Sequence, residues 1–317
     1  MPSLPDDFEP ARGFRDPNAQ TVFAAFARRG GPALRRRRLA TPDGDFVHVD
    51  LLEGRPGLPT VLLLHGLEGS SASGYVQLMM LGLAARGWGG VALNFRSCSG
   101  EPNLRPESYC SGEYRDALWL AKRLPRPLYA AGFSLGGSVL LNLLAQRGAE
   151  SGISAAAAVS VPFGLDECAS LIDNSSGFAS IYLRNFLHTM REKALEKAER
   201  FPDRVDAKKV AAARSIREFD EVVTAPLFGF SSAEDYYQRC STGRQLKDVR
   251  VPTLLISSED DPIAPAHGLP AGAARQANLH VLVTQAGGHV AFVGGSVLRP
   301  RFWSEERVLQ WMESLPR

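Results

Sequence analysis

A serine lies in a pattern that can make its hydroxyl a nucleophile. The sequence Gly132-Phe-Ser-Leu-Gly136 follows small and apolar residues at 129–131 and precedes an apolar run at 139–145. A strand, a tight turn and a helix form the context in which Gly-x-Ser-x-Gly exposes a reactive serine. We expect a strained backbone at Ser134, and we expect Gly132 and Gly136 to let the strand and the helix approach closely.

A histidine could serve as the base for this serine. His289 lies in Ala286-Gly-Gly-His-Val290, directly after the last predicted strand. A turn with two glycines could carry an imidazole over the serine, and imidazole is the commonest general base in enzymes. The other five histidines fall in predicted strands, loops or the helical region. For one of them, His65 at the end of a strand, we expect the backbone to matter more than the ring.

Two adjacent aspartates could supply the acid that orients this histidine. Asp260 and Asp261 follow a predicted strand that ends at residue 257, although such a turn is commonly only solvated. Consecutive side chains of an extended segment point in opposite directions, so only one should reach His289. Pro262 pushes Asp261 towards an extended backbone. One of the two should therefore be the acid that holds the histidine tautomer; the extended backbone favours Asp261, and Asp260 is the alternative.

Backbone N–H groups near the serine could stabilise a developing oxyanion. The N–H of Leu135 begins the helix after Ser134, and that of Leu67 lies in the loop His65-Gly-Leu-Glu-Gly69. This loop follows a strand that we expect beside the strand of the serine. The alternative is a glycine-rich turn with no chemical role.

Apolar strands alternate with amphipathic helices along most of the chain. This alternation predicts a mainly parallel sheet covered by helices on both faces, with a ligand site at the carboxyl edge. Besides the strand and helix around Ser134, strands are predicted at 36–41, 46–52, 60–65, 90–95, 154–161, 251–257 and 279–284, and helices at 74–87, 111–124 and 304–314.

The alternation stops at Pro162. From about 163 to 247 the chain is predicted to be helical and is rich in Phe and Tyr, which favours a helical cap over the carboxyl edge. We expect a largely apolar pocket between this cap and the sheet that reaches Ser134. Residues 1–33 are expected to form an arm over the body of a single domain that spans 1–317.

Composition excludes several classes of function. The chain of 317 residues is 44% hydrophobic and 22% charged with a net charge of +2, values typical of a soluble globular protein without a nucleic-acid partner. Four widely spaced cysteines favour reduced thiols and a cytoplasmic location. The N-terminus lacks a signal-peptide pattern. Oligomeric state is not predicted.

The sequence also argues against a cofactor and a membrane span. Neither a P-loop, nor Gly-x-Gly-x-x-Gly, nor a cluster of metal-ligating residues is present, so we expect no cofactor and no metal. Residues 127–146 carry no charge, as a transmembrane helix would. Their glycine, serine, asparagine and glutamine residues fit the strand, turn and helix around Ser134 better.

The sequence resembles the YheT-like family of bacterial hydrolases, which is related to the eukaryotic abhydrolase-domain proteins 1 to 3. The matching segments are spread over nearly the whole chain: His65–Ser71, Asn94–Asn103, Gly132–Gly137, Ser160–Phe163, Thr224–Phe230, Asp260–Pro262 and Gly287–Val290. The chain departs from the family pattern at Ser97, Cys110 and Asn18, where the family usually has Gly, His and His.

This resemblance implies an α/β-hydrolase fold with a mainly parallel eight-stranded sheet and a helical cap. It implies a serine hydrolase that acts on carboxylic esters, short-chain or lipid acyl esters, through Ser134, Asp261 and His289. The order of nucleophile, acid and histidine along the chain is that of α/β-hydrolases. Two alternatives stay open: acyl transfer to an alcohol, and a non-catalytic binding protein on the same fold.

Overall fold

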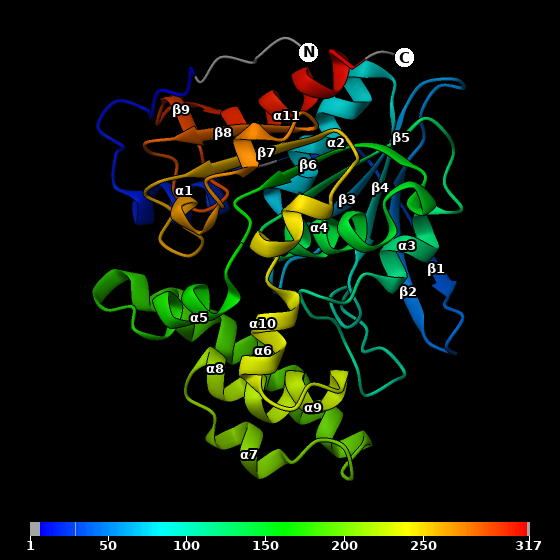
Figure 1. The fold of residues 1–317 in the computed structure, drawn as a ribbon, viewed down its shortest axis with the longest axis vertical. Coiled ribbons are helices and arrows are strands. Elements are labelled where there is room, and N and C mark those ends of the chain that lie inside the picture. Colours follow the sequence, from blue (N-terminus) through cyan, green and yellow to red (C-terminus); the bar gives the residue numbers. More distant parts are fainter. Residues whose placement is uncertain (1–6, 29, 316–317) are drawn as a thin grey trace.

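The chain is built around one eight-stranded sheet (Figure 1). A computed structural model describes residues 7–28 and 30–315, so residues 1–6 and 29 of the predicted arm and the last two residues lie outside the described part. The strands are Arg35–Ala40 (β1), Phe46–Leu52 (β2), Thr60–Leu64 (β3), Gly89–Asn94 (β4), Leu128–Phe133 (β5), Ile153–Val159 (β6), Thr253–Ser258 (β7) and Leu279–Thr284 (β8).

The strand order is β1-β2-β4-β3-β5-β6-β7-β8. β2 is antiparallel to both of its neighbours, and all other pairs are parallel. The predicted mainly parallel, eight-stranded sheet is confirmed, as is the position of β3 beside β5. Because parallel strands end at the same edge, the loops after β3, β5, β6, β7 and β8 meet there.

Helices cover both faces of the sheet. Alternate side chains of a strand point to opposite faces, and β3 is buried on both. Leu62 and Leu64 share a core with α3 (Arg115–Ala121) and α4 (Leu135–Arg147), whereas Val61 and Leu63 share a core with α2 (Gly74–Arg86) and α11 (Trp303–Glu313). The uncharged stretch at 127–146 therefore contains β5 and α4, as the strand-and-helix interpretation predicted.

Six α-helices of 4 to 21 residues lie between β6 and β7 in the sequence and outside the carboxyl edge of the sheet in space (Figure 1). They enclose an apolar cluster of their own, which includes Leu187, Phe219 and Tyr236. A π-helical turn over Asp220–Thr224 joins two of them. The helices are Leu165–Asp173 (α5), Ser180–Arg200 (α6), Ala207–Ala212 (α7), Ile216–Phe219 (α8), Ala225–Phe228 (α9) and Ala233–Cys240 (α10).

The described chain contains a helix and a pair of strands that were not predicted from the sequence. The N-terminal arm contains a helix, Pro17–Ala27 (α1), whose first turn is capped by the Asp16 side chain on the Ala19 N–H at 2.7 Å. An aspartate followed by a proline is a helix-start signal that the composition of the arm obscured. Near the C-terminus, Val293–Ser296 (β9) pairs with Arg299–Phe302 (β10). The helix predicted at 111–124 is shorter than expected.

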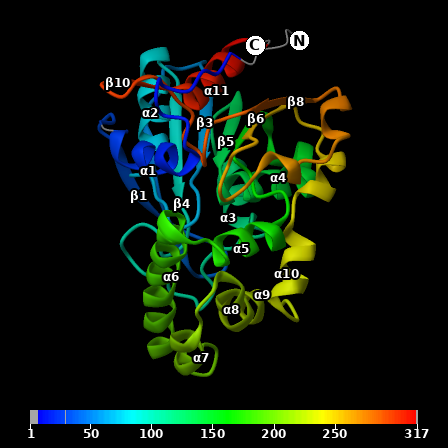
Figure 2. The same ribbon diagram turned by 90° about the vertical axis from the view of Figure 1, so that its left-hand side faces the viewer.

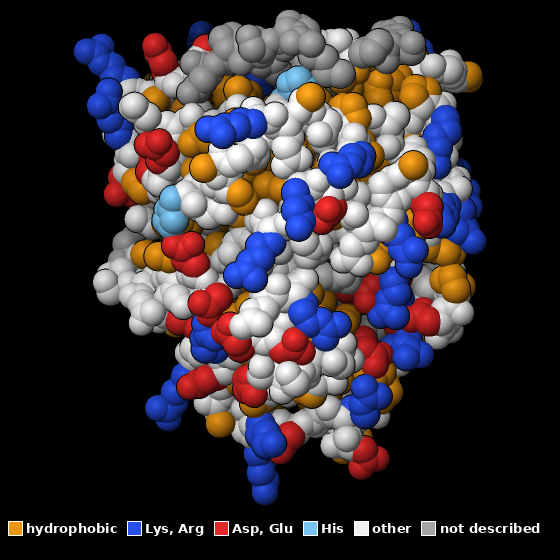
Figure 3. All heavy atoms as spheres, viewed as in Figure 1, with side chains coloured by type: hydrophobic (Ala, Val, Ile, Leu, Met, Phe, Trp, Pro, Cys, Tyr) orange, Lys and Arg blue, Asp and Glu red, His pale blue; other side chains and the backbone are white. Residues whose placement is uncertain are grey.

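The surface shows no concentration of one charge on the face drawn in Figure 3, where Lys and Arg side chains alternate with Asp and Glu. Within the described residues, no helix combines the length and the apolar character that crossing a membrane would need.

Candidate active site

Three side chains from different strand ends meet at the carboxyl edge. Ser134 follows β5, Asp261 follows β7 and His289 follows β8. His289 Nε2 lies 2.8 Å from Ser134 Oγ, and His289 Nδ1 lies 2.9 and 3.0 Å from the two carboxylate oxygens of Asp261. A carboxylate only accepts, so Nδ1 donates its proton and Nε2 is left to accept the serine hydroxyl. This arrangement can activate a serine as a nucleophile.

The backbone at Ser134 is strained, as the sequence predicted. Its φ is 53°, and its N–H donates to the Val159 carbonyl at 2.8 Å. A Cβ on Gly132 would lie 2.4 Å from the Gly136 carbonyl oxygen, and a Cβ on Gly136 would lie 2.4 Å from that of His65. Both glycines are therefore needed for the close approach of β5, α4 and the loop after β3.

The two aspartates point in different directions. Asp261 is buried, and its Oδ1 also accepts the N–H groups of Ile263 at 2.9 Å and Ala264 at 2.8 Å. Asp260 Oδ1 instead accepts the backbone N–H of Gly288 at 3.0 Å. Asp261 thus reaches the His289 ring, whereas Asp260 contacts the backbone of the His289 loop.

In the loop after β3, the backbone N–H of Leu67 lies between two N–H groups that already have hydrogen-bond partners. The N–H of Gly66 donates to Tyr75 Oη at 2.8 Å, and that of Glu68 donates to Tyr109 Oη at 2.9 Å. The N–H of Leu67, between them, donates to no atom of the described residues. The two tyrosines hold the loop and leave this donor available.

Leu135 offers the second predicted donor. It is the first residue of α4, so its N–H has no acceptor within the helix. Leu67 and Leu135 line the same cavity as Ser134 and His289. The structure therefore brings both residues predicted to supply oxyanion donors to one cavity with Ser134 and His289.

The His65 ring makes contacts in addition to those of its backbone, which the sequence analysis did not predict. Its Nδ1 donates to the Gly66 carbonyl at 2.8 Å, and its Nε2 accepts the Phe95 N–H at 3.1 Å. The neutral ring thus joins the ends of β3 and β4 and supports the loop of Leu67. Burial lowers the pKa of His65 to about 4. The contact to Phe95 arises between strands, so no local sequence signal could have shown it.

A cavity of about 630 Å³ lies between the helical region and the sheet edge, as predicted. Apart from Ser134 and His289, its wall is largely apolar and includes Ile172, Phe186 and Met190. A second cavity of about 650 Å³ shares Met190 with the first. The two cavities are therefore adjacent.

Asp220 is the carboxyl group that both cavities share, and the sequence analysis did not single it out. It lies in the π-helical turn and accepts hydrogen bonds from Thr224 Oγ1 at 2.6 Å and Tyr237 Oη at 2.8 Å. Burial raises the pKa of Asp220 to about 6. Turns of this kind are frequent at functional sites.

An open cleft of about 1340 Å³ leads to Ser134 and His289 from one side of the molecule. Its lining includes Val22 and Ala25 of α1 and Tyr182 of α6. Figure 2 shows α1, in blue, above the end of α6. The unexpected helix of the N-terminal arm therefore borders the candidate site.

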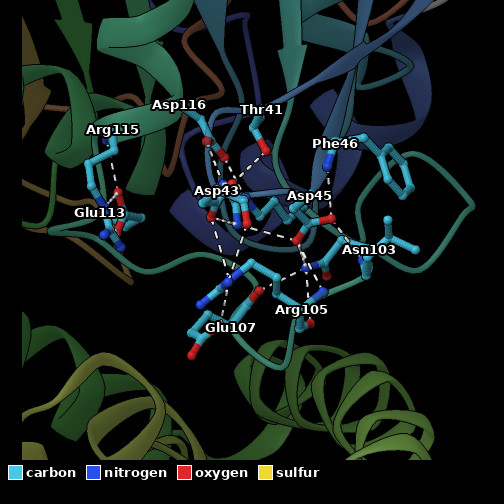
Figure 4. A network of polar contacts seen from close by, with 12 residues as sticks. Thr41, Asp43, Asp45, Phe46, Asn103, Arg105, Glu107, Glu113, Arg115 and Asp116 are labelled. Atoms are coloured by element: carbon cyan, nitrogen blue, oxygen red, sulfur yellow. Dashed lines mark hydrogen bonds and ion pairs between the residues drawn. The ribbon is translucent and has the colours of Figure 1, made fainter.

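A polar network fixes the loop that follows β4 (Figure 4). Arg96 pairs with Asp43 at 2.8 Å and with Asp116 at 2.7 Å, and Asn103 Nδ2 donates to Asp45. From α6, Lys197 Nζ donates to Asn103 Oδ1. This network ties the helical region to the loop whose next residues include Pro106, Ser108, Tyr109 and Cys110, which line the second cavity.

Among the described residues, no group of three or more His, Cys, Asp or Glu side chains is placed to hold a metal ion. All four cysteines are buried and form no disulfide.

The low pKa of His65 makes stability depend on pH. In the unfolded chain its pKa is about 6.5, so the unfolded state binds more protons between pH 6.5 and 4, and stability falls as the pH falls. When the pH is lowered from 7.5 to 5, the unfolding free energy of the wild type should fall by about 2 kcal/mol more than that of His65→Gln. Urea unfolding at both pH values measures this.

The exposed histidine of α6 provides the control, as His188→Gln. If the wild type and His65→Gln lose the same stability between pH 7.5 and pH 5, the assignment of His65 as a buried neutral ring is wrong.

Comparison with known proteins supports the same family. Residues 59–296 match the family described as alpha/beta hydrolase fold. "Putative esterase YheT" of Escherichia coli (strain K12) is 36% identical, with 96% of this chain and 93% of that protein covered. "Phospholipase ABHD3" of Mus musculus is 30% identical, with coverage of 93% and 75%. "Monoacylglycerol lipase" of Saccharomyces cerevisiae is 31% identical, with coverage of 87% and 62%.

Solved structures share the fold at low sequence identity. Mouse alpha/beta hydrolase domain-containing protein 10 aligns with a TM-score of 0.56 and 12% identity, over 88% of this chain and 97% of that one. The Pyrococcus furiosus esterase PF2001 aligns with a TM-score of 0.56 and 16% identity, over 89% and 90%. With the family match over residues 59–296 and the YheT relationship over nearly the whole chain, the protein belongs to the α/β-hydrolase family and is a hydrolase.

Proposed function

We propose that the protein is a serine hydrolase that cleaves carboxylic esters through an acyl-enzyme on Ser134. One observation carries the proposal: His289 connects the Ser134 hydroxyl to the buried Asp261 carboxylate, with hydrogen bonds of 2.8 and 2.9 Å. The same constellation activates serine on several unrelated folds. The relatives named as esterase, phospholipase and monoacylglycerol lipase support an ester substrate.

The proposed reaction begins with proton transfer from Ser134 Oγ to His289 Nε2 as Oγ bonds to the ester carbonyl carbon. The carbonyl electron pair moves to oxygen, and the N–H groups of Leu67 and Leu135 donate to this oxyanion. Asp261 stabilises the imidazolium. Collapse of the intermediate breaks the bond to the alcohol oxygen, which takes the proton from His289.

Water completes the cycle. His289 removes a proton from water as the water oxygen attacks the acyl carbonyl, and collapse releases the carboxylic acid and returns the proton to Ser134. Acyl transfer to an alcohol would differ only in the final acceptor.

We further propose that residues 163–247 act as a cap that encloses the acyl group of a short-chain or lipid ester. The apolar side chains of Ile172, Phe186 and Met190 around the cavity at Ser134 support an aliphatic acyl chain. Burial of each methylene contributes about 0.8 kcal/mol. The rate of hydrolysis should therefore depend on the length of the acyl chain of the ester.

A series of p-nitrophenyl esters tests this substrate class. We expect kcat/KM to rise by up to about fourfold per added methylene until the cavity is filled, and then to fall. Ser134→Ala should reduce hydrolysis of every ester to the background rate. Absence of Ser134-dependent hydrolysis across the series would refute the esterase proposal, and a rate independent of chain length would refute the acyl cavity.

The two aspartates can be separated by kinetics. Asp261→Asn should lower kcat by orders of magnitude, about 10⁴-fold by analogy with a protease triad, because the histidine would adopt the wrong tautomer. Asp260→Asn serves as the matched variant and should keep most of the activity. Thermal unfolding of both variants checks that each is folded. An inactive Asp260→Asn beside an active Asp261→Asn would reverse the assignment.

A further inference from the structure

The loop that carries His289 has an unusual backbone. Gly288, Val290 and Phe292 have φ values of 62°, 50° and 43°. The left-handed region is unfavourable for a β-branched or aromatic residue, and such conformations persist only where surrounding contacts impose them. The contacts that hold this loop therefore decide where the imidazole lies.

One such contact comes from α1. The backbone N–H of His289 donates to Thr21 Oγ1 at 2.9 Å, and the Thr21 hydroxyl donates its own proton to the Pro17 carbonyl at 2.7 Å. With its single proton engaged, Thr21 Oγ1 can only accept from His289. The helix lies so close that a Cβ on Gly288 would be 2.6 Å from the Pro17 carbonyl oxygen.

A second contact comes from the residue that follows α1. Arg28 Nη2 donates to the carbonyl oxygens of Val290 at 2.7 Å and Ala291 at 3.1 Å. Its Nε pairs with Glu305 of α11 at 2.7 Å, and both side chains are almost fully buried. Breaking a buried ion pair is strongly destabilising, so Arg28 is a poor site for a kinetic test. Thr21 is the better one.

We propose that α1 positions the catalytic base, with Thr21 Oγ1 fixing the His289 backbone so that the ring reaches Ser134 and Asp261 together. The inference rests on the proposed function. Thr21 is a positioning residue, because its hydroxyl binds the backbone of His289 rather than a reacting atom. The N-terminal arm is then part of the catalytic apparatus, although it is far from His289 in sequence.

The test compares Thr21→Val with Thr21→Ser in ester hydrolysis. Valine keeps the shape of threonine but removes the acceptor, and a small displacement of a reacting group can cost as much as about 10²-fold in rate. We expect Thr21→Val to lower kcat by about tenfold or more with KM nearly unchanged. Thr21→Ser retains the hydroxyl and should restore most of kcat.

Thr253→Val is the control for loss of a buried threonine hydroxyl. Its Oγ1 donates to the Val251 carbonyl at 2.8 Å at the start of β7, the end of the strand away from Asp261. We expect this variant to lose stability while kcat stays at the wild-type value.

The outcomes separate the inference from the proposed function. A wild-type kcat in Thr21→Val, an effect on KM alone, or an equal loss in Thr21→Ser would overturn the positioning role while the esterase activity stands. Wild-type protein without Ser134-dependent hydrolysis would instead refute the proposed function. If Thr21→Val does not fold, kcat of Thr21→Ala, checked by thermal unfolding, decides by the same criteria.

Discussion

The site depends on two hydrogen bonds, from His289 to Asp261 and from Ser134 to His289, which require each of these side chains to lie within about 3 Å of the next. Each link is close to 3 Å, yet the three residues follow different strands. The sheet meets this requirement because β5, β6, β7 and β8 are neighbours and parallel, so their ends coincide. The strand between them also contributes, since Ser160 after β6 accepts the Val290 N–H at 3.0 Å.

Backbone strain at the site is compensated by contacts around it. Ser134 keeps a φ of 53° because two glycines allow β5, α4 and the β3 loop to pack at close range. Tyr75 and Tyr109 bind the N–H groups on either side of Leu67, and the His65 ring ties that loop to β4. These polar contacts fix the loop beside the cavity at Ser134, whose wall stays largely apolar.

Much of the fold was predictable because its signals are local. Continuous apolar runs identified the strands, and Gly-x-Ser-x-Gly between a strand and a helix located the turn at Ser134. The alternation of side chains separated Asp261 from Asp260, and in the structure they do point to different partners. The catalytic roles of these residues, and the cap role of 163–247, stay predictions.

The features that sequence reasoning missed depend on long-range contacts. The Thr21–His289 bond joins residues 268 positions apart, and the bond from Phe95 to the His65 ring depends on strand pairing. Asp220 is distinctive only because a π-helical turn places it at two cavities. Helix α1 had a local start signal at Asp16 and Pro17 and apolar residues at 22–27, but the Pro and Arg content of the surrounding arm obscured both.

Covalent labelling with a fluorophosphonate, read by mass spectrometry of the intact and digested protein, tests the nucleophile most directly. Such probes react with serines that a neighbouring base activates. The geometry around Ser134 predicts a single adduct on that residue and none in Ser134→Ala. An adduct on another residue, or labelling that persists in Ser134→Ala, would contradict Ser134 as the nucleophile.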